Sequence, residues 1–111
     1  MRKGARRCVH PIIRDLAMRV KSVLMEPRWT IVKIIGNEIK STNEIYKSLQ
    51  NRGLVIPKST LYYHLSTLES MGIIEMAGYR ETGGGAPEKT WQLKARKIVL
   101  DLLTGEIILE R

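Results

Sequence analysis

The sequence has few of the residues from which disulfides and metal centres are built. Its 111 residues include one cysteine, two histidines and no phenylalanine. Cys8 has no second cysteine to pair with, and together with His10 it supplies fewer ligands than a structural zinc site needs. We therefore expect a free thiol, no metal and no cofactor. Such sparse cysteine usage is typical of a reducing compartment, so the cytoplasm is the predicted location.

Long apolar runs and catalytic groupings are missing as well. Charged residues interrupt the apolar stretch from Ile12 to Leu24, which therefore predicts neither a signal peptide nor a membrane-spanning helix. No nucleophile triad, acid/base pair or metal cluster is recognisable, and His64 has no carboxylate or nucleophile at a useful spacing. We expect His64 to be a packing or hydrogen-bonding residue. We expect no catalytic residues, no enzyme activity and no membrane partner.

Basic residues are what the sequence has in excess. There are 19 Lys and Arg residues against 11 Asp and Glu, which gives a formal charge of +8. Seven basic residues and one acidic residue lie within residues 1–25, so the remainder of the chain is nearly neutral. A positive balance of this size favours nucleic acid as a partner ahead of an anionic membrane.

The pattern along the chain divides it into four segments, and its length fits one compact domain. The start is short and basic, which is typical of an arm. After Pro11, apolar residues at helical spacing predict an amphipathic helix to about Met25. The predicted segments are the arm at residues 1–10, the amphipathic helix at residues 11–25, a main domain at residues 26–95 and a C-terminal segment at residues 96–111.

Helices joined by a short turn are predicted in the main domain. Residues 27–36 have the spacing of a helix that begins near its proline and ends at its glycine. Ser41-Thr42-Asn43-Glu44 fits the capping-box pattern, in which a hydroxyl and a carboxylate each bond a backbone amide at a helix start. Gly53 ends that helix and Pro57 begins the next one. This order of elements is a helix-turn-helix.

A β-hairpin follows these helices. Residues 73–79 are rich in β-forming residues, and residues 89–93 alternate so that Trp91 and Leu93 share a face. The loop between them contains Gly83-Gly84-Gly85 and fits a projecting hairpin tip. The predicted fold class is therefore α+β: a winged helix-turn-helix with a three-helix core and a β-hairpin wing, an extra N-terminal helix and a C-terminal β-hairpin or helix.

The pattern of the C-terminal segment is compatible with either a hairpin or a helix. Folded about Thr104-Gly105, residues 97–110 form a hairpin; alternatively, residues 96–103 form a helix. The many β-branched residues favour the hairpin, as does the basic pair Arg96-Lys97, which would oppose the dipole at a helix start. One face of the hairpin would then carry Ile98, Leu100, Leu102, Ile107 and Leu109.

Four stretches resemble known transcription regulators. STLYYHL at residues 59–65, followed by MGIIE at residues 71–75, resembles the recognition-helix region of winged-helix repressors in the ArsR superfamily. PRWTI at residues 27–31 is similar to the start of the first core helix in that group, and GGAPEKTWQL at residues 84–93 is similar to the wing of the PadR group. The resemblance implies DNA binding. Metal-sensing ArsR proteins carry paired cysteines on the preceding helix, and residues 44–51 have none, so metal sensing is not implied.

The candidate DNA contacts follow from this resemblance and from helical spacing. Leu61, Leu65 and Leu68 recur on one stripe, which leaves hydroxyl and phenol groups on the outer face. The predicted recognition-helix contacts are Lys58, Ser59, Thr60, Tyr62, Tyr63 and Ser66. The predicted contacts from the wing and backbone are Arg80, Lys89 and Thr42, and those from the arm are Arg2, Lys3, Arg6 and Arg7.

The sequence thus predicts a sequence-specific regulator that binds double-stranded DNA as a homodimer, on an inverted-repeat operator. Residues 58–71 would enter the major groove, and the wing at residues 79–89 would lie on the minor groove or backbone. The predicted dimer interface consists of Ile13, Leu16, Val20, Leu24, Leu100, Leu102, Ile107 and Leu109. The alternative is a winged-helix module for protein interaction or RNA binding, with Tyr62 and Tyr63 as anchors. No small-molecule effector is predicted.

Overall fold

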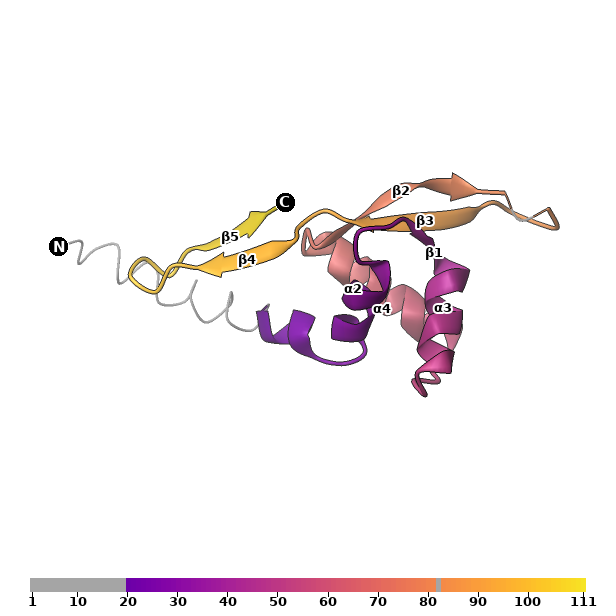
Figure 1. Ribbon diagram of the computed structural model, residues 1–111, viewed down its shortest axis with the longest axis horizontal. Helices are drawn as coiled ribbons and strands as arrows, with labels where there is room; N and C mark the ends of the chain where they lie inside the picture. The colour runs from indigo at the N-terminus through magenta and orange to yellow at the C-terminus, as the bar shows by residue number, and fades with distance from the viewer. Residues whose placement is uncertain (1–19, 82) are drawn as a thin grey trace.

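A computed structural model describes residues 20–81 and 83–111 of the chain (Figure 1). Residues 20–24 are helical. The helices after them are α2 (Arg28–Ile35), α3 (Thr42–Asn51) and α4 (Lys58–Ser70). The strands are β1 (Lys40–Ser41), β2 (Ile74–Arg80), β3 (Glu88–Leu93), β4 (Lys97–Leu100) and β5 (Ile107–Glu110). The predicted arm and the first part of the predicted amphipathic helix lie outside the described residues.

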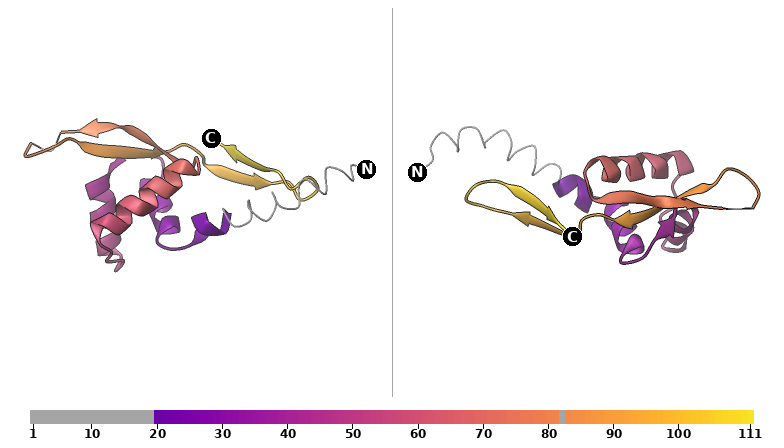
Figure 2. Two further views of the ribbon diagram at one scale, coloured as in Figure 1. Left: turned by 180° about the vertical axis from the view of Figure 1, so that it is seen from behind. Right: turned by 90° about the horizontal axis from the view of Figure 1, so that it is seen from above.

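The strands form two antiparallel sheets. In the first, β3 lies between β1 and β2, and the β2–β3 ladder extends from Ile74 opposite Leu93 to Arg80 opposite Glu88. Both views in Figure 2 show this hairpin extending past the helices, as a wing does. β1 supplies only Lys40 and Ser41 to the sheet, but this pairing fixes the start of α3 beside β3.

The hydrophobic core lies between α2, α3, α4 and the three-stranded sheet. Helical spacing puts Leu61, Leu65 and Leu68 on one side of α4, and all three are buried as predicted. The core is completed by buried apolar side chains from the other elements, chiefly Val23, Ile31, Ile34, Ile35, Ile45, Leu49, Ile73, Ile74 and Trp91. A shared core of this kind fixes α4 relative to the wing.

The capping box predicted at the start of α3 is confirmed. Ser41 Oγ accepts the Glu44 amide at 3.1 Å, and the Ser41 amide donates to Glu44 Oε1 at 2.8 Å. At the other end, Gly53 has φ of +83°, a conformation that costs little only for glycine, and it turns the chain towards α4. The predicted helix-turn-helix is therefore present. Together with the wing it forms the α+β winged-helix fold.

The C-terminal segment is a hairpin rather than a helix. Ile98 pairs opposite Leu109 and Leu100 opposite Ile107, so these four side chains share a face, as predicted. The prediction for Leu102 was wrong, because the turn is longer than Thr104-Gly105 and takes Leu102 out of the strand. Asp101 Oδ1 accepts the amides of Leu103 and Thr104, which holds that turn closed. Among the helices in the described ranges, none is both long and apolar enough to cross a membrane.

Candidate nucleic-acid interface

The outer face of α4 is exposed along its whole length. Tyr62 and Tyr63 are 50% and 63% exposed, whereas the leucines opposite them are buried. Lys58, Ser59 and Ser66 are exposed as well, and Thr60 is half-buried. The structure therefore brings all six predicted recognition-helix residues to one end or one side of α4. Hydroxyl and phenol groups can bond base edges or phosphates and pack on thymine methyl groups.

Lys58 is held against the preceding helix. Its Nζ lies 5.5 Å from the centre of the Tyr46 ring, which is half-buried on α3. A cation over an aromatic face is favourable, so the ammonium is fixed at the N-terminal end of α4. That end is the part of a recognition helix that contacts bases in helix-turn-helix proteins.

Two carboxylates connect the wing to the start of α3. Arg80 Nη1 is 2.7 Å from Glu44 Oε1, and Glu88 Oε2 accepts the amide of Asn43 at 3.1 Å. The pKa of Glu44 lies below its ordinary value, first because the Ser41 amide bonds the carboxylate and second because Arg80 does. The predicted phosphate contact Arg80 is thus exposed but already ion-paired in the free protein.

The prediction that Thr42 contacts DNA was wrong. Thr42 is 2% exposed, because it lies beneath β3 at the first position of α3. Its hydroxyl accepts a hydrogen bond from Trp91 Nε1 at 2.9 Å and donates to the Lys89 carbonyl at 3.3 Å. With both capacities used inside the protein, Thr42 is not available to DNA. It joins α3 to the wing instead.

The tip of the wing is open. A Cβ atom added at Gly83, Gly84 or Gly85 would meet no atom within 4 Å, and of these three only Gly83 has a positive φ, +81°. Packing within the protein therefore does not require glycine at the other two positions. Lys89, on the stem, is exposed and its Nζ lies 6.0 Å from the centre of the Trp91 ring. Three successive glycines permit close approach of another backbone.

Arg28 is a residue that sequence reasoning did not assign to the site. Its Nε donates to His64 Nδ1 at 3.0 Å, which confirms the expected hydrogen-bonding role of His64. The pKa of His64 is lowered, mainly by burial and further by the positive charge of Arg28. Arg28 and His64 are far apart in the sequence, so no local pattern could have paired them. The only sequence signal was the Pro-Arg start of α2.

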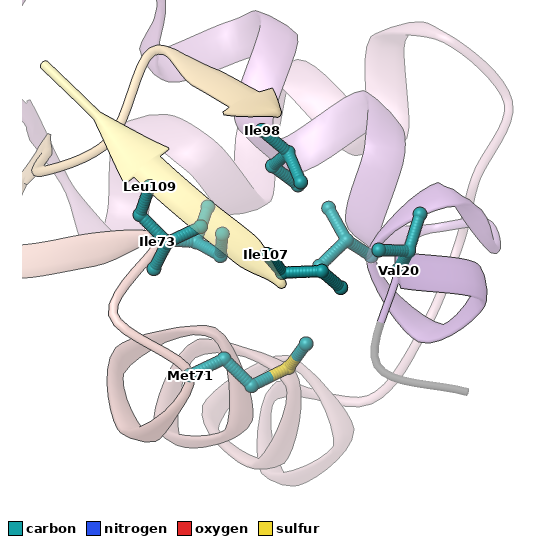
Figure 3. A pocket seen from close by; sticks show the side chains of 7 residues that line it. Val20, Met71, Ile73, Ile98, Ile107 and Leu109 are labelled. Atoms are coloured by element: carbon teal, nitrogen blue, oxygen red, sulfur yellow. The ribbon is translucent and has the colours of Figure 1, made fainter. Parts of the chain in front are cut away.

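The predicted dimer residues divide into two groups in the structure. Val20, Ile107 and Leu109 line an apolar hollow of about 110 Å³ (Figure 3). The hollow is also lined by Val23, Met71, Ile73 and Ile98. Leu24, Leu100 and Leu102 are 53%, 46% and 85% exposed. Ile13, Leu16 and the arm residues Arg2, Lys3, Arg6 and Arg7 lie outside the described residues.

Comparison with known proteins identifies the family. Residues 20–85, which include the helix-turn-helix and most of the wing, match the ferric uptake regulator family. The chain belongs to the ferric uptake regulator family. This is a family of winged-helix, DNA-binding transcription regulators, so the predicted fold and the broad predicted function are confirmed. The narrower resemblance to the ArsR and PadR groups is not confirmed.

A solved structure has a similar fold. The crystal structure of the Vibrio cholerae ferric uptake regulator, which reveals structural rearrangement of its DNA-binding domains, matches with a TM-score of 0.50 and 23% sequence identity. The match covers 79% of this chain and 68% of that chain. At this identity the likeness concerns the fold alone. No curated protein matches the chain significantly.

The family's name implies iron, but the described residues do not fit an iron site. Within residues 20–81 and 83–111, no group of three or more His, Cys, Asp or Glu side chains could hold a metal ion. His64, the histidine in this part of the chain, uses Nδ1 to accept the hydrogen bond from Arg28. The described residues therefore give the site its chemistry through hydroxyl, phenol and basic groups.

Proposed function

We propose that this member of the ferric uptake regulator family is a sequence-specific regulator that acts in the cytoplasm on double-stranded DNA as a homodimer. Residues 58–71 enter the major groove, and the wing at residues 79–89 lies on the minor groove or backbone. The observation that carries the proposal is the outer face of α4, where exposed tyrosines and hydroxyls lie opposite a fully buried leucine stripe. The family match over residues 20–85, which include this helix, supports the same role.

The division of labour follows from the side chains. Ser59, Thr60 and Tyr63 carry no charge, so they suit the choice of sequence better than general attraction. Arg80 and Lys89 on the wing stem, with the basic arm, supply attraction to phosphate in any sequence. Thr42, which is buried, is left out of this set.

A second copy of the chain is proposed to cover the exposed apolar residues of the β4–β5 hairpin. Leu102 and Leu103 at its tip are 85% and 95% exposed, and Val99, Leu100 and Ile108 are 39–47% exposed. Large exposed apolar side chains gathered on one hairpin are typical of a surface that another protein covers. Twofold symmetry would present two α4 helices to successive major grooves about 34 Å apart, so the operator would be an inverted repeat.

The test is a selection from random duplex DNA with the full chain, combined with a mass measurement in solution. We expect an enriched inverted repeat and a dimeric mass. Failure to enrich any motif would overturn sequence specificity, and an exclusively monomeric mass would overturn the dimer. The exposed Tyr62 and Tyr63 are also compatible with RNA, so single-stranded RNA is measured in parallel at rising salt; tighter binding to RNA than to duplex DNA would favour that function instead.

The proposed dimer surface has its own test. Replacing Leu102 and Leu103 by lysine introduces charge at two exposed positions that contribute little to the folded monomer. We expect a monomeric, folded protein that retains binding to single half-sites but loses affinity for the inverted repeat. The control is Val55→Lys, because Val55 is 72% exposed but lies in the turn between α3 and α4. A dimer that survives the double substitution would rule out this surface.

A further inference from the structure

Arg28 connects three elements beside the outer face of α4. Its Nε bonds His64 on α4, and its Nη1 donates to Ser22 Oγ in the helix before α2. Its guanidinium carbon also lies 5.7 Å from the centre of the Tyr63 ring. Two hydrogen bonds in different directions fix the planar guanidinium, which then forms a contact surface for Tyr63.

The Tyr63 ring depends on such contacts for its orientation. Its side chain is 63% exposed, so the core does not enclose it. Its ring lies beside Arg28 and His64, and the His64 ring centre is 5.6 Å away at an interplanar angle of 60°. Arg28 contacts both rings. An exposed side chain without fixed neighbours keeps several rotamers, and ordering it on binding costs entropy.

We infer that Arg28 is a positioning residue for sequence choice: it sets the orientation of Tyr63 on the recognition helix before DNA arrives. The inference rests on the proposed function, because it assigns the origin of specificity within that interface. Ordering Tyr63 in the free protein removes part of the entropy that binding would otherwise lose. Arg28 therefore favours duplexes whose base edges fit this one ring orientation.

A direct contact from Arg28 to phosphate is the competing role. A phosphate contact acts on every sequence alike and contributes about one unit to the salt slope. Lysine retains the charge needed for that contact, but it cannot bond His64 and Ser22 in two directions while lying over the Tyr63 ring. Arg28→Lys therefore separates the two roles.

The experiment compares affinities for the selected duplex and a scrambled duplex across a salt series. For Arg28→Lys we expect the ratio of the two affinities to fall by about tenfold, the range of one mismatched base pair, with an unchanged salt slope. In a Tyr63→Ala background, the same substitution should change the ratio by less than about twofold, because the positioned ring is gone. If Arg28→Lys leaves the ratio of the two affinities unchanged, the inference is overturned. It is also overturned if the fall in this ratio for the double variant equals the product of the falls for Arg28→Lys and Tyr63→Ala.

Two further variants guard against a general loss of structure. His64→Leu removes the acceptor for Arg28 Nε but leaves the guanidinium charge, and we expect the same fall in the ratio. Lys33→Met removes a cation that lies 5.6 Å over the Trp29 ring on the same helix, and it should leave the ratio unchanged. Thermal unfolding and binding to the scrambled duplex confirm that each variant is folded.

Failure of the inference is distinguishable from failure of the proposed function. If the unmodified chain prefers no duplex at all, the proposed function fails and the inference fails with it. If the unmodified chain selects a motif and Arg28→Lys or His64→Leu selects it equally well, only the inference fails. An equal fall in the affinity ratio for Lys33→Met and Arg28→Lys would also count against the inference, since Lys33 lies over Trp29 rather than Tyr63.

Discussion

Two β-hairpins extend from opposite ends of the helical core, and their exposed groups differ in kind (Figure 1). The β2–β3 hairpin has an open tip that contains three glycines, and its stem carries Arg80 and Lys89. The β4–β5 hairpin ends in Leu102 and Leu103, which are almost fully exposed. The first surface suits a phosphate backbone and the second suits another apolar surface, so the two ends of the molecule are adapted to different partners.

The hairpins also differ in how they are held. β3 has a strand on each side, and Trp91 is buried against the helices with its Nε1 bonded to Thr42. β4 and β5 pair only with each other in the described part of the chain, and their inner face lines the apolar hollow. Two-stranded sheets are marginally stable alone. The wing therefore belongs to the folded core, whereas the C-terminal hairpin gains most from a partner.

The largest expected difference between the hairpins is in stability. Trp91→Ala should lower the free energy of unfolding by about 3–5 kcal/mol, because it removes a large buried side chain from the core. Leu103→Ala removes an apolar side chain that is 95% exposed and should change the stability of the monomer by less than about 0.5 kcal/mol. Denaturant unfolding at low protein concentration checks both. Similar losses would remove the distinction between the two hairpins.

A smaller effect is expected where a single hydrogen-bonding group is removed. Thr42→Val keeps the side-chain shape but leaves Trp91 Nε1 without its acceptor, at a cost of about 1–3 kcal/mol. In the other hairpin, Thr104 accepts the Glu106 amide in an exposed turn, where water can replace the lost group, so Thr104→Val should cost less than about 0.5 kcal/mol. A Thr42→Val protein as stable as the unmodified chain would contradict the anchoring of the wing through this hydroxyl.

Removing one negative charge should change the affinity for DNA when the charge lies beside the wing but not when it lies in the C-terminal hairpin. Glu44→Gln keeps the capping box, because glutamine also serves at that position, but it frees Arg80 and removes a negative charge. We expect affinity for every duplex to rise by about fivefold, the equivalent of about 1 kcal/mol for one nearby charge in water. Glu106→Gln makes the same charge change in the C-terminal hairpin and should have little effect. Equal gains from both would indicate that total charge alone matters.

The smallest effect concerns pH. The pKa of His64 is lowered by burial and by Arg28, so as the pH falls below the ordinary value of 6.5 the unfolded chain takes up a proton before the folded chain does. The contribution of neutral His64 to the free energy of unfolding is therefore complete above pH 6.5. It is lost as the pH falls through the folded-state pKa of His64. His64→Gln should flatten this part of the stability profile. The pKa of Glu44 is lowered from 4.5, so the stability that its carboxylate contributes is lost only at more acidic pH. Parallel profiles for the two proteins would contradict the assignment to His64.

Local patterns predicted much of this structure. The capping box at Ser41 and Glu44, the turn at Gly53 and the leucine stripe of α4 depend on residues a few positions apart, and all three are present. The hairpin form of residues 97–110 was also favoured by local composition. Such features follow from backbone preferences and periodicity, which a single sequence displays.

The errors and omissions concern contacts between distant residues. Thr42 was predicted to contact DNA, but Trp91 from β3 covers it and bonds its hydroxyl. Arg28 with His64 and Arg80 with Glu44 are each 36 positions apart, so no periodic pattern records them. Only the packing of α2 and the wing on the other helices creates these pairs. The family was likewise identified by comparison, because the motifs taken alone had suggested the ArsR and PadR groups instead.

The central claim is that α4 chooses the sequence while the wing attracts DNA of any sequence. The most direct measurement compares affinities for the selected and the scrambled duplex, over a range of salt, for Ser59→Ala, Tyr63→Ala and Arg80→Ala. We expect the two α4 variants to lose preference at an unchanged salt slope. Arg80→Ala should weaken binding to both duplexes and lower the slope by about one unit. Equal losses on both duplexes for all three variants would contradict the claim.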